Sequence, residues 1–166
     1  MNTYVTTHRS PVGALTLLAD QDGALSGLRM ADQRHRGPDD PDWIRDPSPF
    51  AAAIEQLDAY FAGQRTEFSV PVNPAGTAFQ REVWDALRAI PYGSTSSYGE
   101  LAARVGRPKA MRAVGLANGR NPIAIVIPCH RVIGADGSLT GYGGGLPNKR
   151  LLLELEGALL APSLPL

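Results

Sequence analysis

The chain is poor in the residues that build disulfides and metal centres. Its 166 residues include one cysteine, Cys129, and three histidines, His8, His35 and His130. A single cysteine excludes an internal disulfide, and these four residues match none of the usual spacings of zinc ligands. We therefore expect no metal site, and any special chemistry of sulfur in this protein must fall to Cys129.

Long apolar runs and targeting signals are also missing. No apolar run reaches the roughly 18 residues that a membrane-spanning helix needs. The N-terminus lacks the charged-then-apolar pattern of a secretory signal. Because a free thiol without an export signal favours a reducing compartment, the expected location is the cytoplasm, and no membrane partner is implied.

The chain has no net charge, but this balance conceals an asymmetry. Residues 1–76 hold 6 Arg and 10 Asp or Glu, whereas residues 77–166 hold 10 Lys or Arg and 6 Asp or Glu. Much of the basic excess falls within residues 97–121. Such a cluster either forms an ordinary solvated helix face or marks a surface for a polyanion.

The N-terminal part has the pattern of a small sheet followed by a helix. Alternating apolar residues and turns predict three antiparallel strands, at residues 4–8, 14–19 and 24–30. The proline- and aspartate-rich residues 32–49 predict an exposed loop. Apolar residues at helical spacing then predict a helix that Ser48 caps and that ends near Gly63. A short strand is expected at residues 68–73, and a boundary between two domains near residue 76.

The C-terminal part has the pattern of several short helices. Thr77 can cap a helix that ends near Ile90, and a second helix begins at Ser97. A tight turn and a helix of small residues, 109–116, then complete the pattern of a helix-turn-helix, which any pair of antiparallel helices also resembles. The remaining expectations are a hairpin of residues 132–134 and 138–142 and a last helix over residues 149–160.

The stretch with the most chemistry surrounds the lone cysteine. Cys129 precedes His130 directly and follows an apolar run, residues 123–127. A neighbouring imidazole can favour the nucleophilic thiolate, but a lone cysteine is also often a small buried hydrophobe. A pKa near 8.5 leaves about 3% thiolate at pH 7, so full ionisation gains at most about 30-fold. Positioning and hydrogen bonding must therefore supply most of any acceleration.

Several motifs in a fixed order give this cysteine a context. They are Ser97-Tyr98-Gly99-Glu100, Arg112-Ala113-Val114-Gly115, Asn121-Pro122, Pro128-Cys129-His130-Arg131-Val132, Tyr142-Gly143-Gly144-Gly145, Lys149 and Leu155-Glu156-Gly157. With these motifs the sequence strongly resembles the O6-alkylguanine-DNA alkyltransferase family. The resemblance is densest over residues 79–157, about half of the chain.

The resemblance implies a fold and an activity. The expected fold class is α+β, with a small antiparallel sheet and helix of ribonuclease H-like type in residues 1–76. Residues 77–166 would form a mostly helical, winged-helix-like domain with a helix-turn-helix. The activity would be direct reversal of DNA damage, in which the alkyl group on O6 of guanine moves irreversibly to the protein's own cysteine. The implied partner is double-stranded DNA with O6-alkylguanine or O4-alkylthymine, with no cofactor and no obligate protein partner.

The family's catalytic roles fall on matching positions of this sequence. By resemblance, Cys129 is the nucleophile and His130 accepts its proton through a bridging water. Glu156 would orient and stabilise the imidazole, although by itself it could be a solvated helix carboxylate. Asn121 would tie the active-site loop to the helix-turn-helix, and the Tyr98 hydroxyl would serve the guanine ring. The substrate pocket would include Asn118, Val132, Tyr142 and Gly143.

The resemblance also implies a DNA-binding surface. Duplex DNA hides O6, so the target base must flip out of the stack. The second helix of the helix-turn-helix would enter the minor groove, where Arg112 fills the space that the base has left. Its small residues suit close approach in a narrow groove. Further DNA contacts are expected from Tyr98, Gln80, Gly99, Arg107, Ala113 and Ala135.

This sequence departs from some members of the family at the pocket. Gly143 stands where some members have serine, so only a backbone N–H can donate to O6 there. Asn118, Gly119 and Ala124 also replace larger or stiffer residues of other members. These differences leave the preferred size of the alkyl group open.

Three other functions compete with this interpretation. Non-catalytic alkyltransferase-like proteins bind lesions, but they replace the cysteine, typically with tryptophan. A cysteine hydrolase is disfavoured because adjacent Cys and His rarely adopt hydrolase geometry and no oxyanion-hole signature is present. A plain DNA-binding regulator would leave Cys129, His130 and Glu156 unexplained.

Overall fold

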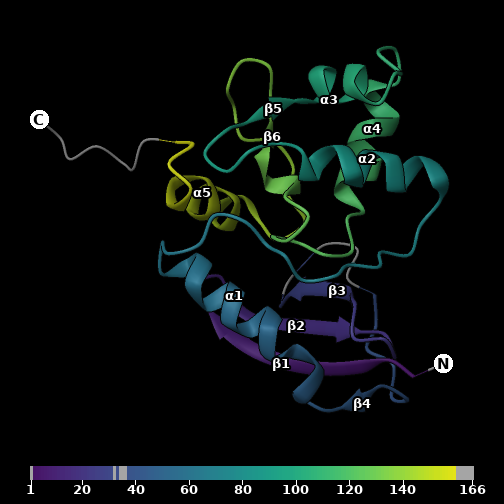
Figure 1. The fold of residues 1–166 in the computed structure, drawn as a ribbon. Coiled ribbons are helices and arrows are strands. Elements are labelled where there is room, and N and C mark those ends of the chain that lie inside the picture. The colour runs from purple at the N-terminus through teal and green to yellow at the C-terminus, as the bar shows by residue number, and fades with distance from the viewer. Residues whose placement is uncertain (1, 32, 34–36, 160–166) are drawn as a thin grey trace, which may run out of the picture.

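The protein is described by a computed structural model that covers residues 2–31, 33 and 37–159. Its N-terminal half contains a four-stranded sheet in the order β3-β2-β1-β4 (Figure 1). The strands are β1 (Tyr4–Ser10), β2 (Gly13–Ala19), β3 (Leu25–Met30) and β4 (Ile44–Arg45).

The three predicted strands pair antiparallel as expected, and a fourth strand that was not predicted makes the sheet mixed. β1 pairs antiparallel with β2, and β2 pairs antiparallel with β3. β4, which lies inside the predicted loop at residues 32–49, runs parallel to β1. A long connection separates it from β3, which frees it from the hairpin geometry that makes consecutive strands antiparallel.

One helix covers this sheet. The 3-10 turn η1 (Ser48–Phe50) leads into α1 (Ala51–Phe61), close to the predicted position (Figure 1). Phe50 of η1 and Leu57 of α1 are fully buried. Ser48 does not cap the helix as predicted, because its hydroxyl donates to the Asp46 carboxylate at 2.8 Å.

The C-terminal half contains four helices within the described residues. They are α2 (Ala78–Arg88), α3 (Tyr98–Arg104), α4 (Met111–Gly119) and α5 (Leu146–Leu155). Thr77 caps α2 as the sequence predicted, and the structure adds a capping box with Gln80. Ser97, where a helix was expected to begin, caps α3. The helix-turn-helix is α3 followed by α4, which starts two residues later than predicted.

Three local predictions were wrong. The short strand β6 (Val132–Ile133) pairs in parallel with β5 (Ser96–Ser97), and residues 138–142 form no strand. Residues 68–73 contribute only one isolated bridge, between Val72 and Leu25. The last helix, α5, begins three residues before Lys149 and ends at Leu155, and Leu160 lies outside the described residues.

The outer strand of the sheet supports the backbone that leads to Cys129. The Leu28 N–H in β3 donates to the Pro122 carbonyl at 2.9 Å, and the Ala124 N–H donates back to the Leu28 carbonyl at 3.2 Å. One hydrophobic core extends from the sheet through both halves. The two halves are thus in contact through this core. The domain boundary near residue 76 stays a proposal.

Candidate active site

The loop before the cysteine is fixed by one buried side chain. Asn121 is 4% exposed; its Nδ2 donates to the Ile127 carbonyl at 2.6 Å, and its Oδ1 accepts from the Ile123 N–H at 2.9 Å. Within this loop Ile125 has a φ of 72°, a left-handed conformation that a β-branched residue rarely adopts. Such strain persists only where the surroundings impose it, so the loop has a defined shape.

Cys129 begins the 3-10 turn η2 (Cys129–Arg131) and is 7% exposed. Burial raises the pKa of its thiol, while the Asn121 side chain and the Lys149 charge oppose that rise. The resting cysteine is therefore a neutral thiol at pH 7. A reaction at this sulfur needs a group that takes its proton.

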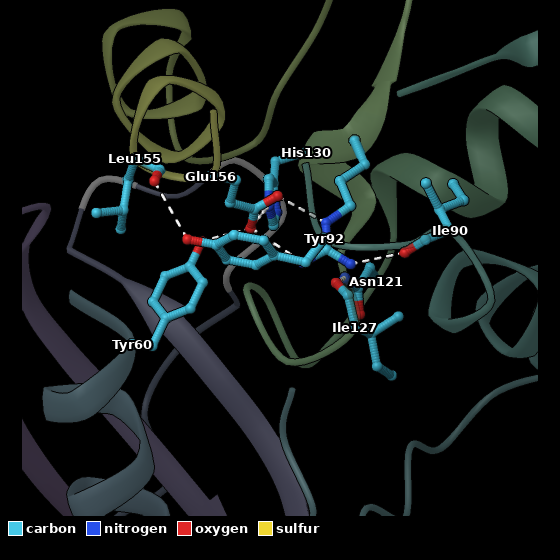
Figure 2. A network of polar contacts seen from close by, with 9 residues as sticks. Tyr60, Ile90, Tyr92, Asn121, Ile127, His130, Leu155 and Glu156 are labelled. Atoms are coloured by element: carbon cyan, nitrogen blue, oxygen red, sulfur yellow. Dashed lines mark hydrogen bonds and ion pairs between the residues drawn. The ribbon is translucent and has the colours of Figure 1, made fainter. Parts of the chain in front are cut away.

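His130 and Glu156 form the buried pair that the sequence predicted (Figure 2). His130 Nε2 lies 2.7 Å from Glu156 Oε2, and both side chains are fully buried. Since a carboxylate only accepts, Nε2 carries the hydrogen and Nδ1 is the basic atom. Nδ1 has no hydrogen-bond partner among the described residues. Burial lowers the pKa of His130 and Glu156 partly opposes this, so the ring is neutral at rest.

Two further residues bind the Glu156 carboxylate, and the sequence analysis missed both. Arg131 donates from Nε to Oε1 at 2.7 Å and from Nη2 to Oε2 at 3.1 Å. The Tyr60 hydroxyl donates to Oε2 at 2.6 Å. Burial would raise the pKa of Glu156, but hydrogen bonds from His130 and Arg131 bring it down to about 2. Glu156 is thus a carboxylate throughout the neutral range.

Arg131 also ties this pair to the segment that follows α2. Its Nη1 donates to the Ile90 carbonyl at 2.7 Å, and its guanidinium lies 5.8 Å from the centre of the Tyr92 ring. The residue stands inside the motif that contains Cys129, which was the available signal for finding it.

Lys149 is fully buried and lies on α5. Its Nζ donates to the Val132 carbonyl at 2.6 Å and to the Thr140 carbonyl at 2.7 Å. Burial lowers its pKa to about 8, and the neighbouring Cys129 opposes that change. Lys149 is one of the motif residues on which the family resemblance rests, but the sequence predicted no function for it.

A cavity gathers most of the predicted pocket around Cys129. Besides the cysteine it is lined by Gln33, Asn118, Gly119, Asn121, Ala124 and residues 141–144. Two polar atoms in its lining, Asn118 Oδ1 and the Tyr142 hydroxyl, are buried with no hydrogen-bond partner among the described residues. Such atoms are rare in folded proteins and are well placed to bind a polar ligand. Val132 lies outside this lining and is fully buried, and its carbonyl binds Lys149.

The predicted DNA-contacting residues of the helix-turn-helix lie on or beside α4. Arg112 and Ala113 are exposed, and Arg112 makes no hydrogen bond or ion pair with the described residues. Tyr98 opens α3, where its ring lies against Gly115 and its hydroxyl accepts from Thr140 at 3.2 Å. Tyr98 is absent from the lining of the Cys129 cavity, so its expected role at the guanine ring stays a prediction.

The other predicted contacts are dispersed around this helix pair. The Gln80 side chain is engaged at the start of α2, and the guanidinium of Arg107 lies 5.2 Å from the centre of the Phe79 ring. Gly99 is the second residue of α3, and Ala135 is exposed in a turn. Their contact with DNA stays a prediction.

Within the described part of the chain, no cluster of three or more His, Cys, Asp or Glu is arranged to hold a metal ion. None of its helices is both long enough and apolar enough to cross a membrane.

Two family models match consecutive parts of the chain. The ribonuclease-like domain of 6-O-methylguanine DNA methyltransferase matches residues 3–74, and the DNA binding domain of the same family matches residues 78–158. The methylated-DNA–protein-cysteine methyltransferase of Mycolicibacterium paratuberculosis is 60% identical over 147 residues, covering 89% of this chain and 88% of that protein. Its counterpart from Methanosarcina acetivorans is 49% identical over 156 residues, covering 93% and 99%.

Solved structures point to the same family as the sequence comparisons. The crystal structure of Mycobacterium tuberculosis OGT in complex with DNA is similar with a TM-score of 0.86 and 55% identity, covering 95% of this chain and 94% of that one. The O6-methylguanine-DNA methyltransferase from Pyrococcus kodakaraensis has a TM-score of 0.61 at 27% identity, covering 93% and 99%. The chain belongs to the O6-methylguanine DNA methyltransferase family.

Proposed function

We propose that this protein repairs O6-methylguanine in double-stranded DNA by accepting the methyl group on Cys129, once per molecule. One observation carries the proposal. Cys129 lines a cavity whose wall includes Asn118 of α4, and the same helix exposes Arg112, which has no partner among the described residues. A single helix can thus contact DNA and shape the pocket for the reacting base.

The comparisons support the substrate. The curated relatives are methylated-DNA–protein-cysteine methyltransferases, and the M. tuberculosis protein was crystallised with DNA. The flipped base would leave a gap in the stack that Arg112 can fill, at a cost of a few kcal/mol for unstacking. The exposed Ala113 beside it permits close approach to a narrow groove.

The methyl transfer needs neither an oxidant nor a cofactor. The Cys129 thiol gives its proton to Nδ1 of His130, through an intervening water. The thiolate attacks the methyl carbon, so an S–C bond forms while the C–O6 bond breaks. The electron pair of the broken bond returns to guanine, which takes up one proton.

The surrounding charges fit this sequence of steps. The thiol is neutral at rest, so the proton must leave before or during attack. Once His130 is protonated, the Glu156 carboxylate at 2.7 Å stabilises the imidazolium. The pocket would supply the larger part of the rate, because Asn118 and Tyr142 can hold the base in line with the sulfur.

Intact-mass measurement after incubation with an O6-methylguanine duplex tests the proposal. We expect the mass to rise by one methyl group per protein, on the peptide that contains Cys129, and the reaction to stop at one equivalent. The Cys129→Ala variant should bind the duplex and gain no mass. Multiple turnovers, or an unmodified cysteine, would refute the proposal.

A further inference from the structure

We propose that Tyr60, in the N-terminal half, is a positioning residue for the transfer: its hydroxyl holds the Glu156 carboxylate and shares its charge, which keeps His130 neutral and ready to accept the thiol proton. This inference rests on the proposed function and extends it to the half of the chain to which the sequence analysis assigned no catalytic role.

The geometry places Tyr60 directly on the catalytic pair (Figure 2). It lies on α1, 96 positions before Glu156, and is 1% exposed. Its hydroxyl donates to Oε2 at 2.6 Å, the same oxygen that lies 2.7 Å from His130 Nε2. Tyr60 and His130 therefore compete for the charge of one oxygen.

Aromatic neighbours leave the Tyr60 ring little freedom. Its centre lies 5.1 Å from that of Phe61, 5.3 Å from that of Phe68 and 6.3 Å from that of Tyr92. The first and third contacts have the edge-to-face arrangement that aromatic pairs favour. Because the ring is held on several sides, the hydroxyl is directed at Glu156 by packing and gives the carboxylate a fixed position.

The hydroxyl affects when His130 can act as a base. A hydrogen bond from Tyr60 disperses negative charge on Oε2, so less of that charge is available to attract a proton onto His130. Without it, His130 would be protonated at higher pH and could no longer accept the thiol proton. Burial raises the pKa of Tyr60 and the Glu156 charge raises it further, so this donor stays protonated across the working range.

The other groups around the pair leave this role to Tyr60. Arg131 and Lys149 are cationic and lower the pKa of His130 by repulsion. The Tyr142 hydroxyl makes no hydrogen bond to the described residues, and the Tyr92 hydroxyl donates to the Leu155 carbonyl at 3.2 Å. Within the described residues, Tyr60 is the one tyrosine whose hydroxyl donates a hydrogen bond to the Glu156 carboxylate.

The Tyr60→Phe variant tests the inference through the pH dependence of single-turnover transfer. We expect the acidic limb of the rate profile to move to higher pH by about one unit, the size of one charge-assisted hydrogen bond. At pH values on the acidic limb, the variant should react about tenfold more slowly than the wild type. On the plateau at higher pH, the difference should be less than about threefold. The same shift should occur with the free base O6-benzylguanine, since the effect concerns the proton acceptor, and half-saturation by duplex DNA should not change.

Tyr92→Phe is the matched control. It removes a hydroxyl beside the same site but one that binds a backbone carbonyl, so its acidic limb should coincide with that of the wild type. A Tyr60→Phe profile that superimposes on the wild type, or an equal shift in both variants, would overturn the inference.

Substitution of Tyr60 by 3-fluorotyrosine keeps the test decisive if Tyr60→Phe fails to fold. The more acidic phenol is a stronger donor, so the limb should move to lower pH, and an unmoved limb would overturn the inference. Methyl gain by the wild-type protein is measured in parallel. Its absence would refute the proposed function itself, whereas methyl gain with an unshifted limb refutes only the role of Tyr60.

Discussion

Lys149 Nζ donates a 2.6 Å hydrogen bond to the carbonyl of Val132, three positions after Cys129. A second bond of 2.7 Å reaches the Thr140 carbonyl. One buried amine on α5 therefore joins the segment after the nucleophile to the segment that leads into the cavity wall at residues 141–144. The side chain of Lys149 is fully buried, and this burial lowers the pKa of the amine to about 8.

Replacing Lys149 should loosen both segments. In Lys149→Met the two carbonyls lose their donor, so we expect the free energy of unfolding in urea to fall by about 2 kcal/mol. Methyl transfer should slow about tenfold, because the cavity wall is no longer tied to the cysteine segment. Arg150→Met is the control, since Arg150 is exposed and its ion pair with Glu154 is 3.7 Å long, and it should change stability by less than about 0.5 kcal/mol.

The cavity wall also depends on a close approach of β3. A Cβ on Gly144 would collide with the Met30 sulfur and with the Tyr142 ring, whereas a Cβ on Gly141 would meet nothing within 4 Å. Gly144→Ala should therefore lower the free energy of unfolding by about 1–3 kcal/mol and reduce the transfer rate. Gly141→Ala, in the same loop, should match the wild type in both measurements. Equal behaviour of the two variants would contradict this account of the wall.

The sequence predicted those parts of the site that depend on neighbouring positions. The spacing of residues identified Thr77 as the cap of α2, although not its capping box with Gln80, and the order of motifs singled out Cys129, His130 and Glu156. Without the resemblance Glu156 could have been a solvated helix carboxylate, because its burial depends on packing that no local pattern shows.

Two of the errors and omissions share one physical cause, which is pairing between distant segments. β6 was expected to turn back on the residues that follow it, but it pairs with β5, about 36 positions earlier. Tyr60 belongs to a helix that the sequence places correctly, yet its partner lies 96 positions away. Periodicity identifies the buried face of α1 and cannot show which polar atom on that face meets a carboxylate.

Acid should destabilise the protein through Glu156. Its pKa is about 2 in the folded protein against an ordinary value of 4.5, so the stabilisation is fully present above about pH 4.5 and is lost as pH falls toward 2. This shift corresponds to about 3 kcal/mol. His130, whose pKa is lowered from 6.5, adds a loss in the same direction that begins below pH 6.5.

Urea unfolding at several pH values measures this dependence. At neutral pH, Glu156→Gln should have a lower free energy of unfolding than the wild type. Between about pH 5 and pH 2, the free energy of unfolding should decrease in this variant by about 3 kcal/mol less than in the wild type. Glu82→Gln, at a half-exposed carboxylate, should follow the wild-type curve. Parallel curves for wild type and Glu156→Gln would show that the carboxylate is not stabilised by its partners.

Arg112 provides a test that separates extrusion of the base from chemistry. It is exposed on α4 without a partner among the described residues, and the Cys129 cavity is lined by other residues. Arg112→Ala should slow transfer from an O6-methylguanine duplex at least tenfold, because nothing fills the gap that the flipped base leaves. Transfer from free O6-benzylguanine needs no extrusion and should change less than about twofold.

Arg9→Ala removes one exposed charge from β1 and should leave both rates unchanged, which controls for the loss of general attraction to DNA. Equal losses of Arg112→Ala on both substrates would place Arg112 in the chemical step and rule out a role confined to extrusion.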